Sequence, residues 1–219
     1  MITANIQKIN QEIGVRARLI AVSKTKPLEM VLEAYQGGQR IFGENKVQEL
    51  VQKYDALPKD IEWHLIGHLQ SNKVKYIAPF VHMIHGVDSL KLLQTINKEG
   101  AKNKRQINCL LQIFIAQEET KYGLNQSELF DLLDAIREEP LPHIQICGLM
   151  GMASNVSDEK QIRHEFKELK NLFSLVQAQY FAENPAFKEI SMGMSGDYPI
   201  AIEEGATLVR VGSLIFGER

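Results

Sequence analysis

The apolar residues of this chain follow a pattern that switches repeatedly between two periods. Residues 2–13 carry isoleucines at intervals of four, three and four, which predicts one face of an N-terminal helix that ends at Gly14. The continuous apolar run at 18–23 predicts a buried strand, and 28–38 returns to helical spacing before two glycines. The chain therefore begins with a helix, which is followed by a strand–helix unit.

The same alternation of a strand with a helix continues to the end of the chain. The predicted strands are 18–23, 40–43, 62–67, 82–87, 107–116, 144–152, 189–194 and 207–212. Strands that alternate with helices pair in parallel through right-handed crossovers, and eight units in a short chain favour a closed barrel. An open doubly wound sheet is the alternative, although no G-x-G-x-x-G motif opens a helix. We expect an α/β fold of one domain over residues 1–219, a (β/α)8 TIM-like barrel with an extra N-terminal helix.

Composition narrows the classes of partner. The 219 residues include 25 basic and 27 acidic residues, so no broad charged surface for nucleic acid or anionic lipid is expected. Cys109 and Cys147 lie inside apolar runs and do not make the disulfide framework of a small secreted protein. The N-terminus lacks the pattern of a signal peptide, and no stretch approaches the ~20 apolar residues of a membrane span. A cytoplasmic protein is expected.

The turns after the seventh and eighth strands have the composition of an anion site. In such barrels phosphate is commonly held by the loops after these two strands. Gly193 to Asp197 place Ser195 between glycines just before a helix, where free N–H groups and the helix dipole favour an anion. After strand eight, Gly212 and Ser213 form a second small turn with a hydroxyl group. The carboxylate of Asp197 is expected to cap the helix and to point away from the anion.

A lysine stands at the end of the first strand. Closure of the barrel pairs strand one with strand eight, so Lys24 is expected about one strand spacing, ~4.8 Å, from the strand-eight turn. A lysine amine is nucleophilic only when it is neutral, and burial beside a cation such as Arg210 favours that form. A ligand with a phosphate at one end and an aldehyde at the other would fit this arrangement.

Several long motifs in this order resemble the pyridoxal phosphate homeostasis protein family, the single-domain relatives of the barrel half of bacterial alanine racemase. The resemblance spans nearly the whole chain. It rests on AVSKTKP (21–27), FGENKVQE (42–49), EWHLIGHLQSNK (62–73), GLMGMAS (148–154), SMGMSGDYPIAIEEGAT (191–207) and VRVGSLIFGER (211–219).

The resemblance implies pyridoxal 5′-phosphate (PLP) as the cofactor, held as a Schiff base on Lys24. It places the phosphate at Met194 and Ser195 of the GMS turn and at Gly212 and Ser213.

The resemblance also assigns two residues to the ring of the cofactor. It sets Arg210 against the pyridine nitrogen and Asn45 near the ring hydroxyl. An arginine keeps its proton and leaves that nitrogen unprotonated, which weakens the cofactor as an electron sink. The expected function is therefore PLP binding for intracellular vitamin B6 homeostasis and supply, without strong catalytic activity. A monomer that makes transient contact with PLP-dependent apo-enzymes is expected.

Two enzyme classes stay open as alternatives. A PLP-dependent amino-acid racemase would use the same lysine, but two-base racemization needs an acid or base on each face of the substrate carbon. The alanine racemase relatives take one of these groups from a second domain and a partner subunit. A Schiff-base aldolase acting on a sugar phosphate also needs a lysine and a phosphate site in a barrel.

The remaining candidate residues receive no role in the site. His64 and His68 are four apart but straddle a strand end and Gly67, so no metal site is expected. His82 and His85 flank the fourth strand with no cysteine or acidic cluster expected nearby. Lys121 could be a second amine, but an exposed loop lysine is the preferred interpretation.

Overall fold

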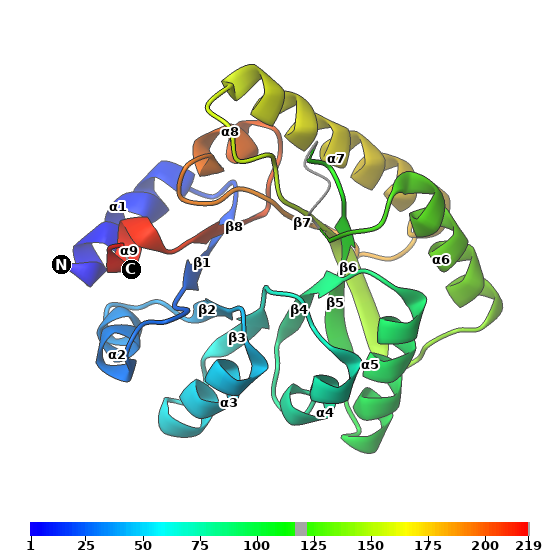
Figure 1. Ribbon diagram of the computed structural model, residues 1–219, viewed down its shortest axis with the longest axis horizontal. Coiled ribbons are helices and arrows are strands. Elements are labelled where there is room, and N and C mark those ends of the chain that lie inside the picture. Colours follow the sequence, from blue (N-terminus) through cyan, green and yellow to red (C-terminus); the bar gives the residue numbers. More distant parts are fainter. Residues whose placement is uncertain (117–121, 219) are drawn as a thin grey trace.

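The computed structural model describes residues 1–116 and 122–218, and these form a closed barrel of eight parallel strands. Each strand pairs with its neighbour in sequence, and β1 pairs with β8 to close the barrel (Figure 1). The strands are β1 (Arg18–Val22), β2 (Ile41–Glu44), β3 (Glu62–Leu65), β4 (Met83–Val87), β5 (Ile107–Ile113), β6 (Ile144–Gly151), β7 (Glu189–Ser191) and β8 (Leu208–Val211). The predicted (β/α)8 barrel is confirmed, and the open sheet is excluded.

Helices surround the barrel on its outer side (Figure 1). They are α1 (Ile2–Ile13), α2 (Leu28–Gln36), α3 (Val47–Ala56), the 3₁₀ turn η1 (Ser71–Lys73), α4 (Val74–Ile77), α5 (Leu90–Lys102), α6 (Gln126–Glu138), α7 (Glu159–Tyr180), α8 (Tyr198–Glu203) and α9 (Ser213–Phe216). The extra N-terminal helix α1 ends at Gly14, as the isoleucine spacing predicts. Within the described part of the chain, no helix is both long and apolar enough to span a membrane.

The apolar core has two layers. A large cluster lies between the strands and the outer helices, and a separate small cluster is formed by alternate strand residues. The members of the small cluster are Ile20, Met83, Leu110, Cys147, Met150 and Leu208. Along a barrel strand, every second side chain points into the barrel and the others point toward the outer helices. The small cluster therefore forms the core inside the barrel.

Closure of the barrel puts the first and last strands side by side. Ile20 is the cross-strand partner of Arg210, and Ala21 is the partner of Val211. The two chains leave these strands at the same end of the barrel, because the strands are parallel. The turn that contains Lys24 therefore lies beside the turn that contains Gly212, as the sequence predicts.

Several strand ends and one short helix differ from the sequence-based prediction. The predicted strand 189–194 ends at Ser191, because Gly193 turns the chain with φ of 90°. The short helix α9 was not predicted. It packs against α1, where Asn5 Nδ2 donates to the carbonyl of Ile215 at 3.1 Å, so both ends of the chain lie together (Figure 1).

Candidate functional site

A pocket of about 360 Å³ opens where β1 and β8 end. All seven residues proposed from the sequence line it: Lys24, Asn45, Met194, Ser195, Arg210, Gly212 and Ser213. A larger hollow of about 940 Å³ adjoins it and shares Lys26 and Asn45. The smaller pocket is the better candidate site, because it combines an amine, a guanidinium and two glycine-containing turns.

Lys24 lies in a tight turn directly after β1. The Lys26 N–H donates to the carbonyl of Ser23 at 3.0 Å, which closes the turn around Lys24. Thr25 has φ of 65°, a left-handed conformation that is unusual for a β-branched residue. Its N–H donates to Glu49 Oε1 at 2.6 Å, so a carboxylate from α3 holds the strained residue. Backbone strain of this kind concentrates at functional sites.

A buried ionic cluster supports this turn from below. Lys53 of α3 is 3% exposed, and its ammonium donates to the carbonyl of Ser23 at 2.6 Å, to Glu44 Oε1 at 2.7 Å and to Glu49 Oε1 at 2.8 Å. The Ser23 hydroxyl donates to the same Glu44 oxygen at 2.6 Å. Burial raises the pKa of Glu44, and the charge of Lys53 opposes that rise.

Sequence reasoning missed this cluster, although two signals were present. Glu44 directly follows the predicted strand 40–43, and Glu49 and Lys53 have the i, i+4 spacing of a helical ion pair. Neither signal shows that the lysine is buried beneath the end of β1.

The turns after β7 and β8 meet in the pocket. The Gly212 N–H lies 3.3 Å from Ser195 Oγ and donates to it, which ties the two turns together. A Cβ on Gly193 would lie 2.5 Å from the Cβ of Ala201, so only glycine fits at this position. The expectation that Asp197 caps the following helix was wrong. Its Oδ1 instead accepts the Met194 N–H at 2.5 Å, so the carboxylate braces the turn from within.

Arg210 is the buried cation of the site. Arg210 is 4% exposed, and its guanidinium donates to Ser191 Oγ at 2.6 Å and to the carbonyl of Gly151 at 3.0 Å. Burial lowers the pKa of Arg210 to about 10, so the side chain stays charged at neutral pH. Ser191 Oγ is also within 2.9 Å of His85 Nδ1, and His85 Nε2 is 2.9 Å from His64 Nδ1. A buried polar chain thus runs from the pocket into the barrel.

Other residues considered in the sequence lie elsewhere. His68 stacks on Tyr122 and has Nδ1 3.6 Å from Asp88 Oδ2, next to the larger hollow. Lys121 lies outside the described residues. His82, for which no cysteine or acidic cluster was expected, has one carboxylate beside it, because Glu62 Oε2 lies 3.5 Å from its Nε2.

Comparison with known proteins identifies the family. The sequence matches the model of the alanine racemase N-terminal domain over residues 1–219. The pyridoxal phosphate homeostasis protein of Aquifex aeolicus is 42% identical over 93% of this chain and 87% of that protein, and the human protein of the same name is 41% identical over 94% and 78%.

A solved structure shares the fold over the full chain. The structure of PipY from Synechococcus elongatus PCC7942 without PLP has a TM-score of 0.92 with 34% identity, over 99% of this chain and 100% of that one. The structure of PipY with PLP bound has a TM-score of 0.88 with 33% identity, at the same coverage. This chain therefore belongs to the alanine racemase N-terminal domain family and, within it, to the pyridoxal phosphate homeostasis proteins.

Proposed function

We propose that this protein binds PLP in the pocket between β1 and β8 and takes part in intracellular PLP homeostasis and supply. The observation that carries the proposal is the meeting of Lys24, Arg210 and the two small-residue turns in one pocket. Relatives that carry the name pyridoxal phosphate homeostasis protein, and PipY with PLP bound, support the same ligand. Residues 1–219 would form a single PLP-binding domain.

The pocket fits the charge distribution of PLP. Ser195 and Ser213 bring hydroxyl groups, and Gly212 adds a main-chain site without a side chain, so a phosphate group would find several donors there. A Cβ on Gly212 would approach the carbonyl of Val22 to 3.0 Å, which leaves little room for any residue other than glycine. A side chain on Gly196, which also lines the pocket, would meet no atom within 4 Å. Open space thus remains beside the hydroxyl groups.

The opposite side of the pocket would hold the ring and the aldehyde. Lys24 would supply the primary amine for the Schiff base, from a turn that Glu49 and Lys53 hold in place. Arg210 would face the pyridine nitrogen as a donor that keeps its proton, and Asn45 would bond to the ring hydroxyl. PLP, when bound, supplies an aldehyde carbon that bonds reversibly to amines, together with a ring that absorbs visible light. A cation opposite the ring nitrogen suits storage better than carbanion chemistry.

The test compares Lys24→Ala with Lys26→Ala. Lys26 lines the same pocket, but its ammonium donates to the carbonyls of Gly217 and Glu218, each at 2.9 Å. We expect wild type and K26A to take up PLP with a visible band that borohydride bleaches, and K24A to lack that band. Mass spectrometry of the reduced protein should locate the adduct on Lys24.

Each other outcome has a definite meaning. A wild-type protein that takes up no PLP would overturn the proposed ligand, and borohydride trapping with a sugar phosphate instead would favour the aldolase. An adduct on Lys26 would overturn only the residue assignment. Rapid exchange of the α-proton of alanine or serine by the PLP-loaded protein, at ~1 s⁻¹ or more, would favour the racemase over the carrier.

The cellular part of the proposal concerns transfer. A monomer in the cytoplasm would release PLP to apo-enzymes through transient contact. Mixing the loaded protein with a PLP-dependent apo-enzyme tests this. We expect activity to return faster than with the same concentration of free PLP, and an equal or slower return would argue against direct transfer.

A further inference from the structure

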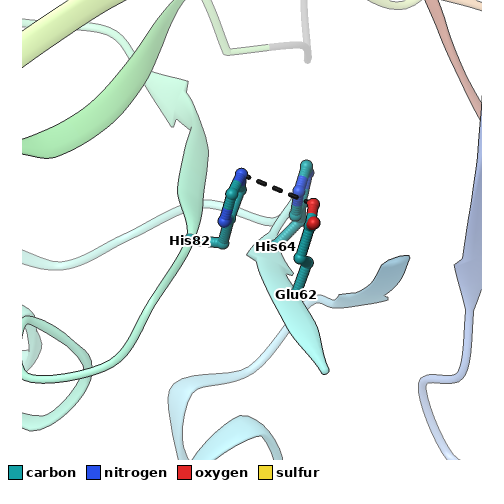
Figure 2. A group of neighbouring side chains, drawn as sticks. All are labelled: Glu62, His64 and His82. Atoms are coloured by element: carbon teal, nitrogen blue, oxygen red, sulfur yellow. Dashed lines mark ion pairs between the residues drawn. The ribbon is translucent and has the colours of Figure 1, made fainter. Parts of the chain in front are cut away.

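A second group of polar side chains lies at the end of the barrel opposite the pocket. Glu62 is the first residue of β3, His64 is two residues further, and His82 directly precedes β4. Each offers one ligand atom, and these three atoms lie within 4.8 Å of one another. Figure 2 shows the three side chains gathered between the two strands, with His82 facing Glu62. This group lies outside the PLP pocket.

His64 has the arrangement expected of a metal ligand. The side chain is fully buried, and its Nδ1 lies 2.9 Å from His85 Nε2. Its second nitrogen, Nε2, is buried and has no hydrogen-bond partner among the described residues. Buried polar atoms nearly always have a partner, so this nitrogen calls for an explanation.

The surroundings of His64 resemble the support of a metal-bound histidine. Such a histidine normally donates its other N–H to a fixed acceptor, which sets the tautomer and the ring orientation. His85 Nε2 can accept that hydrogen from His64 Nδ1, and His85 Nδ1 can in turn donate to Ser191 Oγ. In this direction of donation, His64 Nε2 is the acceptor atom.

The local charge also suits a cation. The carboxylate of Glu62 is 3.5 Å from His82 Nε2 and contributes a negative charge. Arg18 is the nearby cation whose charge acts on His64, and it is neutralised by Glu189, with Nη2 at 2.7 Å from Oε1. A divalent cation at the group would therefore meet one carboxylate and two imidazoles, and Glu189 offsets the charge of Arg18.

We propose that Glu62, His64 and His82 form a binding site for Zn²⁺. Two histidines and one carboxylate are a known zinc ligand set, which leaves a fourth position for water. Zinc bonds of ~2.0–2.2 Å require the ligand atoms to approach one another to about 3.3 Å. The rings of His64 and His82 are parallel, with centroids 5.3 Å apart, so His82 must rotate to share an ion with the fixed His64. His82 and Glu62 are 39% and 40% exposed, and solvent leaves both side chains free to make this movement.

The test is a Zn²⁺ titration of the chelator-treated full chain in competition with a chromophoric chelator. We expect one ion per chain in wild type and a loss of affinity of about tenfold or more in His82→Ala and in Glu62→Gln. His164→Ala is the matched control, since His164 and Glu168 form an exposed pair with Nε2 3.3 Å from Oε1. Substitution of Co²⁺ for Zn²⁺ should give the visible absorption of a site with nitrogen ligands, and this absorption should be absent in H82A.

Two further controls show that the zinc is not bound in the PLP pocket and that a loss of affinity is not caused by unfolding. Lys24→Ala should bind Zn²⁺ as wild type does, because Lys24 lies at the other end of the barrel. Circular dichroism should show that H82A and E62Q keep the wild-type fold. A wild type that takes up no stoichiometric Zn²⁺ would overturn the proposal, as would an equal loss of affinity in H164A and H82A.

Discussion

Substitution of Lys53 tests most directly how the buried ionic cluster stabilises the turn that carries Lys24. The change Lys53→Met keeps much of the side-chain volume and removes the ammonium from Ser23, Glu44 and Glu49. Glu44, which is 0% exposed, would then keep a buried carboxylate with no cation beside it. Breaking a buried ion pair from one side costs about 3–5 kcal/mol of the free energy of unfolding.

Urea unfolding measures this loss. With an m-value of about 3 kcal/mol/M for a chain of this size, the midpoint of K53M should fall by about 1–2 M. Replacement of both partners should lower the free energy of unfolding by less than the sum of the two single changes. The reason is that Glu44→Leu removes the buried carboxylate that K53M leaves without a cation. The double variant K53M/E44L is therefore the control for the mechanism.

The penalty of K53M should also depend on pH. Burial raises the pKa of Glu44, and removal of Lys53 removes a group that opposes the rise. A carboxyl whose pKa is raised on folding favours the folded state at low pH, and that contribution is lost as the pH increases through the raised pKa. The loss of stability in K53M should thus be largest near neutral pH and smaller near pH 5. A loss below about 1 kcal/mol, or a double variant as unstable as the sum, would refute this reasoning.

Three further substitutions or modifications have definite expected results. Gly148→Ala should lower the free energy of unfolding by at least about 3 kcal/mol, because the backbone has φ of 152° and the added Cβ would lie 1.8 Å from the carbonyl oxygen of Glu189; a loss under 1 kcal/mol in urea would contradict this. Thr25→Gly should raise stability by about 0.5–1 kcal/mol, since glycine relieves the strain at φ of 65°, and a destabilised variant would show that the threonine side chain makes a larger contribution. Burial raises the pKa of Cys147 from 9.0 to about 11, so below pH 9 its thiolate fraction should be about 100-fold smaller in the folded protein than in the unfolded protein. Its reaction with a thiol reagent should become about tenfold faster with each pH unit, and equal rates in folded and unfolded protein would exclude this protection.

The strand order and the place of the pocket could be predicted because they follow from rules that act along the chain. Eight apolar runs alternating with helices leave few arrangements other than a barrel, and parallel strands bring their carboxyl ends to one side. The turns around Lys24, Ser195 and Gly212 therefore had to meet once the barrel closed.

The support of the site could not be predicted in the same way. The burial of Lys53 depends on how α3 lies against β1 and β2, which the spacing of apolar residues does not determine. The error on Asp197 has a similar cause. A carboxylate before a helix usually caps it, but here the Asp197 carboxylate accepts the Met194 N–H inside the loop.

The carboxylate beside His82 could have been predicted from the topology. Glu62 begins the third strand and His82 directly precedes the fourth, so the topology alone puts both at the same edge of the barrel. Pairing histidines only by their separation in sequence favoured His64 with His68 and overlooked the neighbouring strand.

The two ends of the barrel are joined by a chain of hydrogen bonds whose direction can be reasoned from its end groups. The guanidinium of Arg210 can only donate, so Ser191 Oγ accepts from it at 2.6 Å. If the Ser191 hydroxyl donates to His85 Nδ1, then His85 donates to His64 Nδ1, and His64 Nε2 carries a hydrogen. If a cation occupies His64 Nε2, both histidines must donate in the opposite direction, toward Ser191. A cation bound by Glu62, His64 and His82 would therefore fix the direction of the hydrogen bond beside Arg210, the residue proposed to face the PLP ring.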